Sequence, residues 1–294
     1  MICQRMLENL YIHINCLTIM ASMMPTRRKF IQMSGLAAGA MMLSSSATAV
    51  QGKTPNAVFD LDFSDSADAA DNTSTSAGWV VDRRAPESWT TDAGRLRIDI
   101  DESAETSGFY AYQGKKYQDA DGAYWNAGAG SRLSYRFYID PAWETDSEAH
   151  ESGVWPVLGD ANGNISAYPI LAYQDGDASD TGEARFRTYV YESDEDGNFV
   201  GDEWIDLGLP KKLGIDPEAG GWVTVEAQLQ SLNDGAALKW RIDNRLVFDE
   251  RGYNVFSPST QFLEFIINSV NFGNDATYYY DDFTLSTPGN ARNK

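Results

Sequence analysis

The sequence predicts an all-β protein, a sandwich of two antiparallel sheets. Helical periodicity is nearly absent, and short segments rich in Tyr, Phe, Val, Trp and Thr alternate between the two faces of a strand instead. Turn-forming clusters separate these segments, as in Asn233-Asp234-Gly235 and Asp196-Gly197-Asn198. Strands that follow one another without intervening helices indicate a single β-sandwich domain.

Nine strands are predicted along the chain. They cover residues 57–63, 96–100, 108–113, 132–139, 184–191, 222–229, 238–242, 262–268 and 277–285. We expect the first and the last of them to be adjacent. The chain shows no internal repeat and no long linker, so we expect one domain over residues 50–294, with frayed ends.

The first 49 residues are predicted to be an export signal. The run Thr26-Arg27-Arg28-Lys29-Phe30-Ile31-Gln32 is followed by an apolar stretch over 33–43 and by Ala47-Thr48-Ala49. This pattern resembles a twin-arginine signal, and an ordinary secretory signal would lead to the same destination. A start at Met23 or Met24 would give a signal of normal length, so residues 1–22 are interpreted as an over-extended start. We expect a secreted or periplasmic protein.

Removal of this signal also removes both cysteines, and His150 is then the only histidine. Disulfides, cysteine–zinc sites, cysteine nucleophiles and histidine-rich metal clusters are thereby excluded. The apolar stretch over 33–43 is too short to remain as a membrane span, and no other apolar run approaches about 20 residues. We therefore expect a soluble monomer.

The chain is strongly acidic, with a formal net charge of −20. Such a charge disfavours nucleic acid and anionic membranes as partners. The acidic residues gather in turn-like stretches over 60–71, 144–151, 175–183 and 192–203, which we interpret as solvated loops.

Two predicted strands each carry arginine and tyrosine on one face, because side chains alternate across a sheet. One such face holds Arg185, Arg187, Tyr189 and Tyr191, and the other holds Arg132, Ser134, Arg136 and Tyr138. Two interpretations remain open. The arginines either pair with neighbouring acids on an outer face, or line a groove for an anionic or hydroxyl-rich polymer, because guanidinium groups bind carboxylates and tyrosine rings stack on sugars.

The C-terminal half carries a recognisable series of segments. They are Gly221-Trp222-Val223-Thr224-Val225, the hairpin over 238–247, the segment over 262–272, and Tyr278-Tyr279-Tyr280-Asp281-Asp282-Phe283. The series resembles concanavalin-A-like jelly rolls and, more closely, family-14 polysaccharide lyases, which cleave alginate or glucuronan. The resemblance covers roughly residues 130–286. It implies a jelly-roll sandwich and an anionic, uronate-containing polysaccharide as partner.

The resemblance also places individual residues. Tyr189-Val190-Tyr191 matches the family's Tyr-x-Tyr, and Ser166-Ala167-Tyr168 matches its Ser-Ala-Arg with tyrosine in place of arginine. Gly153-Val154-Trp155-Pro156 matches a Gly-Lys-Leu-Pro segment, with Val154 where the family has its functional lysine. We expect Arg185 and Arg187 to replace the missing positive charge.

The implied reaction is β-elimination, in which a base removes the C5 proton of a uronate while positive charge neutralises its carboxylate. We expect Tyr189 or Tyr191 to act as base or acid, with Arg187 on the carboxylate. His150 either reaches this site or is a loop histidine. The residues expected to bind substrate are Arg185, Ser166, Tyr168, Arg132, Arg136 and Trp155.

Two other functions use the same fold. A retaining β-glucanase needs two carboxylates about 5–5.5 Å apart, hence Glu-x-Asp-x-Glu on one strand, and the nearest string, Glu192-Ser193-Asp194-Glu195-Asp196, departs at its last position. A non-catalytic lectin-like module would use the same aromatic residues without the elimination chemistry. This second alternative stays open.

No cofactor is required by either hypothesis, but a structural Ca²⁺ site is conceivable. Its oxygen ligands would be Asp60, Asp62, Asp281 and Asp282, from the first and last predicted strands. The competing interpretation is that these acids are solvated on an edge strand.

Overall fold

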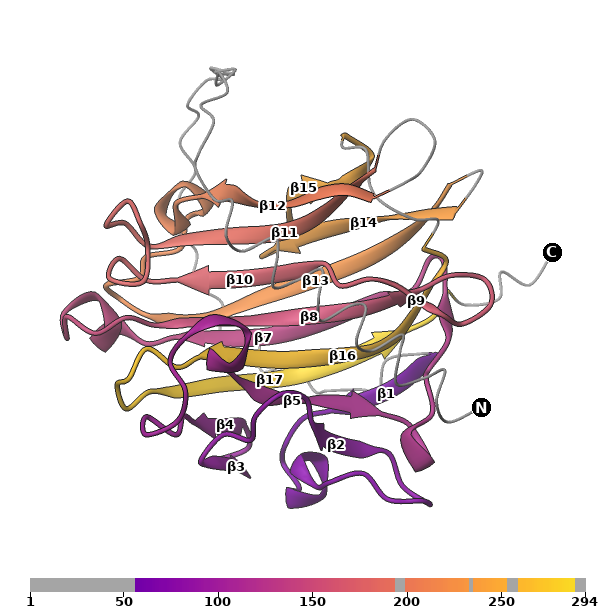
Figure 1. Ribbon diagram of the computed structural model, residues 1–294, viewed down its shortest axis with the longest axis horizontal. Coiled ribbons are helices and arrows are strands. Elements are labelled where there is room, and N and C mark those ends of the chain that lie inside the picture. The colour runs from indigo at the N-terminus through magenta and orange to yellow at the C-terminus, as the bar shows by residue number, and fades with distance from the viewer. Residues whose placement is uncertain (1–55, 194–198, 233–234, 253–258, 289–294) are drawn as a thin grey trace, which may run out of the picture. The chain divides into compact units, whose positions relative to one another are not determined.

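Two antiparallel sheets overlie one another in the computed structural model, which describes residues 56–193, 199–232, 235–252 and 259–288 (Figure 1). For residues 191–193, 199–200, 235 and 252 the structure describes the backbone but not the side chain. The predicted export signal lies outside the described residues. Within them, helical structure is limited to short 3-10 turns, and no helix is long and apolar enough to cross a membrane.

The first sheet is centred on β7 and is called the β7 sheet. Its strands, in spatial order, are β15 (Arg245–Asp249), β14 (Gly235–Ile242), β13 (Gly221–Leu232), β7 (Arg132–Ile139), β17 (Thr277–Ser286), β4 (Leu96–Asp99) and β3 (Ser88–Thr91), with β1 (Ala57–Leu61) also paired to β17. The first and last strands of the described chain are therefore adjacent, as predicted.

The second sheet is centred on β8 and is called the β8 sheet. Its strands, in spatial order, are β12 (Phe199–Gly208), β11 (Arg185–Ser193), β10 (Ile170–Gln174), β8 (Glu151–Gly159), β16 (Gln261–Val270), β5 (Tyr112–Gln118) and β2 (Gly78–Val81). Two short strands complete it, β6 (Ala127–Gly128) on β16 and β9 (Ile165–Ala167) on β8. This topology confirms the expected two-sheet jelly-roll sandwich.

The 3-10 turns connect the strands at the ends of the sandwich. They are η2 (Ser66–Ala69), η3 (Gly108–Ala111), η4 (Ala120–Gly122), η5 (Pro141–Glu144), η6 (Pro210–Leu213) and η7 (Glu250–Gly252). The strand predicted over 108–113 was wrong in its position, because η3 occupies most of that stretch and β5 begins only at Tyr112.

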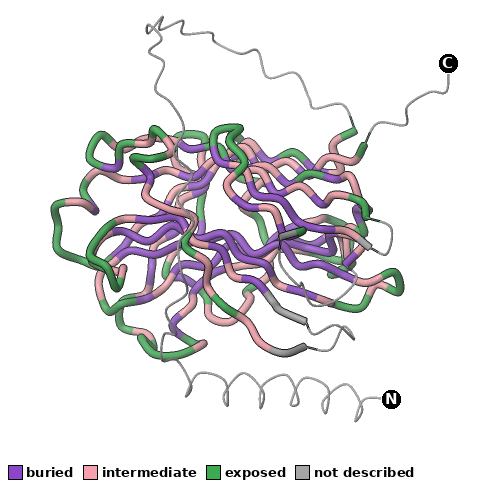
Figure 2. The backbone as a smooth tube through the Cα atoms, turned by 90° about the horizontal axis from the view of Figure 1, so that it is seen from above, coloured by how far each residue is buried: buried purple, intermediate pink, exposed green. Residues whose placement is uncertain are grey.

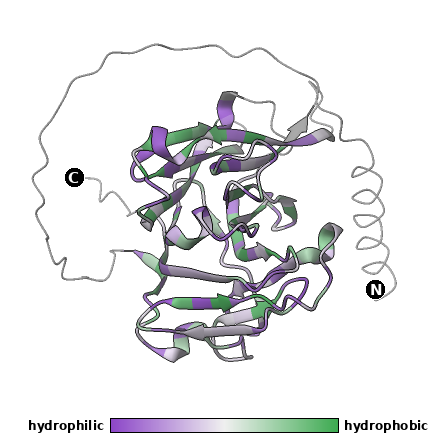
Figure 3. Cartoon of the chain, turned by 90° about the vertical axis from the view of Figure 1, so that its left-hand side faces the viewer, coloured by the Kyte–Doolittle hydropathy of each residue, from purple (hydrophilic) through white to green (hydrophobic). Residues whose placement is uncertain are grey.

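Alternating side chains from both sheets fill the interior. Along β7 buried residues alternate with more exposed ones. Figure 2 shows buried residues gathered toward the interior and exposed ones in the connecting loops, and Figure 3 shows hydrophobic and hydrophilic residues interspersed along the strands. Phe283 of β17 lies between Tyr135 of β7, at 5.1 Å between ring centroids, and Phe265 of β16, at 4.9 Å. Because Phe283 and Phe265 come from different sheets, their stacked contact joins the two layers.

A proline stands in the central strand of the β8 sheet. Strand β8 pairs with β10 through Glu151–Val154 and with β9 through Leu158 and Gly159, and between these two pairings the neighbouring chain passes through Tyr168 and Pro169. Pro156 lies beside this interruption. The ladder is open there on one side, so a residue without an N–H is accommodated within a central strand.

Glu250 at the start of η7 is a buried carboxyl whose ionisation opposes folding. Its side chain accepts a hydrogen bond from the Leu238 N–H at 2.5 Å, and burial raises its pKa from 4.5 to about 7. The carboxyl thus loses its proton more readily in the unfolded chain than in the folded one. Stability contributed by the neutral form is complete below pH 4.5 and is lost as the pH rises through 7.

We expect Glu250→Gln to remove this pH dependence. The amide oxygen still accepts the Leu238 hydrogen bond and cannot ionise. Relative to the variant, the wild type should lose roughly 3 kcal/mol of unfolding free energy between pH 4.5 and 7. Urea denaturation of both proteins across this range measures the difference, and two parallel stability curves would contradict the assignment.

Candidate functional site

The outer face of the β8 sheet, turned away from the β7 sheet, carries a second apolar cluster that we call the aromatic face. Its buried members are Trp155, Val157, Ile170, Ala172, Leu263 and Ile266, and half-buried rings pack against them: Tyr112, Tyr124, Tyr168, Tyr189 and Trp204. Strands β5, β8, β10, β11, β12 and β16 all contribute. Half-buried aromatic rings on an outer sheet surface are suited to stacking on a ligand.

Strand β8 sets the centre of this face. Val154 and Leu158 point into the main core, whereas Trp155 and Val157 between them belong to the aromatic face. All nine residues of β8 are buried, so the strand is covered on both sides. Val154, which stands where the resembled family has its functional lysine, therefore does not reach the outer face.

Arg187 of β11 lies at one end of the aromatic face. Its guanidinium forms an ion pair with Glu151 and lies over the Trp204 ring, 3.8 Å from the centroid. Glu151 is buried and also accepts a hydrogen bond from Gln174 Nε2 at 2.9 Å. Tyr189, two residues along β11, packs against the same Trp204 ring at 5.2 Å. Arg187, Tyr189 and Trp204 thus form one continuous surface, and Glu151 neutralises its charge.

Arg185 continues the row and is engaged by acids. It pairs with Asp180 at 3.2 Å and with Asp206 at 3.4 Å, while its own side chain is only 10% exposed. Tyr191 belongs to β11 and pairs with Asp202 in the ladder, but its side chain lies outside the described residues. Of the predicted row, Arg185, Arg187 and Tyr189 share the outer face as expected.

A second guanidinium lies at the centre of the aromatic face. Arg83 stacks over Phe109 at 3.8 Å and over Trp155 at 4.4 Å, and it forms an ion pair with Asp82. Tyr112 packs edge-on against Trp155 at 5.1 Å. A cation that lies on an aromatic ring is held in place without losing its donors.

Glu264 of β16 marks the opposite end from Arg187. It accepts a hydrogen bond from Gln118 Nε2 at 2.5 Å, and Lys116 lies 3.6 Å away. Burial raises the pKa of Glu264, and burial together with Glu264 raises the pKa of Tyr168 to about 12. The Tyr168 hydroxyl is therefore neutral at ordinary pH, suited to hydrogen bonding and not to proton abstraction.

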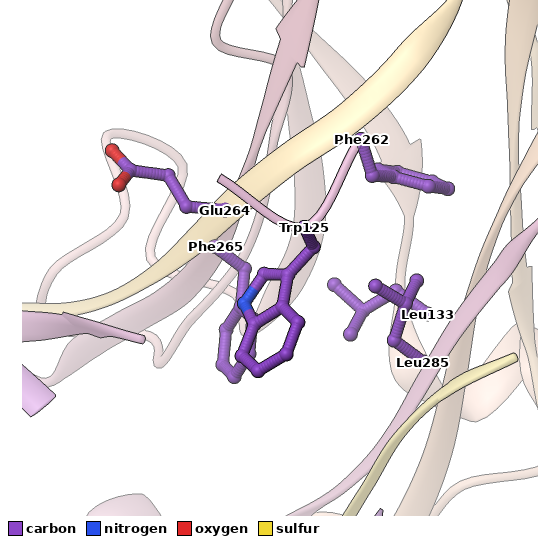
Figure 4. Close-up of a pocket in the computed structure, with 6 residues that line it drawn as sticks. All are labelled: Trp125, Leu133, Phe262, Glu264, Phe265 and Leu285. Carbon is purple, nitrogen blue, oxygen red and sulfur yellow. The ribbon is translucent and has the colours of Figure 1, made fainter. Parts of the chain in front are cut away.

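A small apolar cavity lies directly behind Glu264 (Figure 4). Trp125, Leu133, Phe262, Phe265 and Leu285 line it, and Figure 4 shows the Glu264 carboxylate pointing away from these side chains. The cavity belongs to the packing between the sheets. The Glu264 side chain therefore lies on the outer side of the strand, where it is buried against Gln118 and Lys116.

The serine of the predicted site lies close to this end. Ser166 of β9 is half-buried, and its hydroxyl lies 2.9 Å from that of Ser259. The structure thus places six of the predicted site residues on or beside the outer face of the β8 sheet: Arg185, Arg187, Tyr189, Trp155, Tyr168 and Ser166.

Arg132 and Arg136 do not join this site, which corrects their predicted role in the same groove. They belong to β7, in the opposite sheet, where Arg132 pairs with Glu226 at 3.3 Å and Arg136 pairs with Asp281 and Asp282. Residue alternation shows which side chains share a face of one strand. It does not show to which sheet that strand belongs.

His150 also lies away from the aromatic face. It is buried, its Nδ1 lies 2.7 Å from Asp175 Oδ2, and its ring stacks on Trp143 at 5.1 Å. Trp143 belongs to the main core, so His150 lies on the inner side of the sheet, whereas the next residue, Glu151, meets Arg187 on the outer side. It is therefore neither part of the row on β11 nor a solvated loop histidine.

The four aspartates of the predicted calcium site are partly engaged by other groups. Asp60 accepts a hydrogen bond from the Thr284 hydroxyl at 3.0 Å, and Asp62 accepts one from Ser64. A bulge at Asp282, with φ of 51°, turns both Asp281 and Asp282 toward Arg136. Burial raises the pKa of Asp281 to about 6. A calcium site at these residues stays a prediction.

Sequence reasoning missed several residues of the aromatic face. Glu151, Trp204, Arg83, Glu264 and Tyr112 all contribute to it, and none was singled out. Trp204 lies in β12, where acidic and glycine residues obscure the alternation, whereas Tyr112 lies within the strand predicted over 108–113 but was given no role. Glu151 and Glu264 are single acidic residues within buried strands. Their place on the aromatic face becomes clear only when the pairing of β8 with β16 is known.

Solved structures similar to this chain include carbohydrate-active enzymes. An alginate lyase from a Chlorella virus is 13% identical, with 72% of this chain and 93% of that chain covered and a TM-score of 0.46. An endo-β-1,4-glucuronan lyase from the fungus Trichoderma reesei is 14% identical, with 71% and 87% covered and a TM-score of 0.38. A family-16 endo-glucanase from Bacteroides ovatus is 13% identical, with 78% and 99% covered and a TM-score of 0.46.

No protein-family model matches the chain, and no curated protein matches its sequence. The strand topology described above establishes the sandwich by itself.

We expect removal of one partner of the Arg187–Glu151 pair to destabilise the protein strongly. Arg187→Met leaves the buried Glu151 carboxylate without its cation, which should cost about 3 kcal/mol of unfolding free energy. The double variant Arg187→Met/Glu151→Gln removes both charges and should recover at least half of this loss. Chemical denaturation of the three proteins measures the effect.

Arg185→Met provides a matched control on the same strand face. Its partners Asp180 and Asp206 are 88% and 50% exposed, so they remain solvated and the loss should be about 1 kcal/mol or less. Equal losses of unfolding free energy for the two arginine variants, or no recovery in the double variant, would contradict the prediction. Either result would show that the cost of Arg187→Met does not come from an unpaired Glu151 carboxylate.

Proposed function

We propose that this protein binds a polysaccharide across the aromatic face of the β8 sheet. The observation that carries the proposal is the group of half-buried rings, Tyr168, Tyr112, Tyr189 and Trp204, that pack against one apolar cluster on the outer surface of this sheet. Rings gathered on one surface can stack on the apolar faces of sugars. Polar groups at both ends, around Arg187 and around Glu264, supply hydrogen bonds to hydroxyls.

The charge of the face bears on the kind of polysaccharide. Arg187, Arg185 and Arg83 each pair with a carboxylate, so the arginines are fixed in position but are not a surplus of positive charge. An anionic sugar would have to compete with Glu151 or Asp82 for a guanidinium. A neutral or weakly charged polysaccharide requires no such exchange, and the face accommodates it as it stands.

We expect Trp204→Ala to weaken polysaccharide binding by about 1 kcal/mol, or roughly fivefold in Kd. Trp222→Ala is a matched control, because Trp222 is also half-buried with an arginine over its ring, Arg136 at 4.7 Å, but lies on the β7 sheet. Affinity electrophoresis against alginate, glucuronan, ulvan and neutral β-glucans measures both. Equal weakening by the two variants would contradict binding on the aromatic face, as would an absence of affinity for the whole panel.

A second function, cleavage of a uronate-containing polysaccharide by β-elimination, is favoured by one observation. The Tyr189 ring and the Arg187 guanidinium both contact Trp204, so a tyrosine hydroxyl and a carboxylate-binding group belong to one surface. On this hypothesis Arg187 would exchange Glu151 for the substrate carboxylate. Tyr189 would then remove the C5 proton or protonate the leaving oxygen.

Tyr189→Phe separates this activity from binding, because it removes one hydroxyl and keeps the ring. For a lyase, the variant should lose product formation, followed as ultraviolet absorbance of the new double bond, and should keep its Kd. Tyr138→Phe on the β7 sheet is the control and should leave the rate unchanged. A wild-type protein that binds but forms no unsaturated product would leave the protein as a non-catalytic binder.

We also propose that the protein acts outside the cytoplasm, after export and removal of residues 1–49. The proposal is supported by the twin-arginine run and the Ala47-Thr48-Ala49 end. A polysaccharide substrate or ligand outside the cell is consistent with that location.

A further inference from the structure

The loop that precedes β8 places three metal-binding side chains together. Asp146, Glu148 and His150 occupy alternate positions between η5 and β8, and Ser147 between the first two adopts a left-handed conformation with φ of 62°. One ligand atom from each residue lies within 4.8 Å of the other two. The three side chains thus converge on one point, at the surface end of a buried histidine.

His150 is held in the orientation that a metal ligand requires. Its side chain is 3% exposed, and its Nδ1 lies 2.7 Å from the fully buried Asp175 Oδ2. The other Asp175 oxygen accepts the Ala178 N–H at 2.7 Å, and Trp143 stacks on the imidazole ring with an interplanar angle of 17°. The position of the ring is therefore fixed, with the Nδ1 N–H donating to Asp175.

The remaining ring nitrogen is directed at the loop carboxylates. Nε2 of His150 lies 3.7 Å from Asp146 Oδ2, and among the described residues it makes no hydrogen bond. Neighbouring ligand atoms of a tetrahedral zinc site are about 3.3 Å apart for bonds of about 2.0–2.1 Å. An ion between Nε2, Asp146 and Glu148 needs only small shifts of two side chains at the surface.

We propose that Asp146, Glu148 and His150 bind a divalent transition-metal ion, with Zn²⁺ as the best match. One imidazole and two carboxylates suit zinc, whereas Ca²⁺ and Mg²⁺ prefer oxygen ligands alone. Asp175 is the carboxylate that orients the ligating histidine from behind, an arrangement that recurs at zinc sites. The ion would offset the negative charge of Asp146, Glu148 and Asp175, which surround the His150 ring.

The metal site is separate from the aromatic face. The His150 side chain packs against Trp143 and Tyr278 on the inner side, at ring distances of 5.1 and 6.5 Å, whereas Glu151 lies on the outer side with Arg187. A metal ion would fasten the loop to the first residues of β8. Its expected role is structural, so binding and thermal stability report it directly, without reference to any activity on polysaccharide.

The test is titration of the purified, chelator-treated protein with Zn²⁺ in a calorimeter. We expect one ion per chain, a rise in Tm on saturation, and affinity at least tenfold higher for Zn²⁺ than for Ca²⁺. Asp146→Asn and Glu148→Gln should each weaken Zn²⁺ binding at least tenfold. Both residues lie on an exposed loop, so these variants should keep the Tm of the metal-free protein.

Glu102→Gln is the matched control, since Glu102 is an exposed loop acid outside the cluster, and it should leave zinc affinity unchanged. Absence of Zn²⁺ binding would overturn the proposal. Equal affinity for Ca²⁺ and Zn²⁺ would also overturn it, because it would show that the imidazole is not a ligand. Equal weakening of zinc binding by Glu102→Gln and Glu148→Gln would show that the ion does not bind at this loop.

Discussion

The stack of Tyr135, Phe283 and Phe265 is the contact on which the arrangement of both sheets depends. Phe283 and Phe265 come from central strands of opposite sheets, and their nearly parallel rings fix how β17 and β16 lie across the interior. Once these inward positions are fixed, alternation determines the outward ones. Ile266, next to Phe265, is thereby turned toward the aromatic face, and Asp282, next to Phe283, toward Arg136.

The two outer surfaces of the sandwich differ because their strands differ in composition. On the β7 sheet, outward arginines pair with outward acids, and the aromatic rings among them, such as Trp222, lie against these arginines. On the β8 sheet, a continuous apolar cluster occupies outward positions of β8, β10 and β16, and ion-paired groups lie beside it at Arg83, Arg187 and Glu264. This apolar cluster, with half-buried rings packed against it, distinguishes a candidate binding surface from an ordinary solvated one.

Much of the fold was predictable from the sequence, because the alternation of buried and exposed side chains is visible within a single strand. Strand β7 was predicted with its observed bounds and β17 within one residue, because each alternates clearly between a buried and an exposed side. Strands β8 and β10 were missed because they are buried on both sides and show no alternation. The row Arg185, Arg187, Tyr189 was predictable within one strand, whereas its partners Glu151 and Trp204 depend on pairing between distant segments.

Burial of β8 on both sides has an evolutionary consequence. Trp155, Val157 and Ile170 are packed as tightly as residues of the main core, so a substitution on the aromatic face tends to change folding as well as recognition. A change of ligand preference is therefore more accessible at the rim, where Trp204 and Tyr168 are only half-buried. In such a surface, substitutions that change ligand preference are expected at the rim, whereas the buried central residues stay the same. Specificity can then change without a change in the fold.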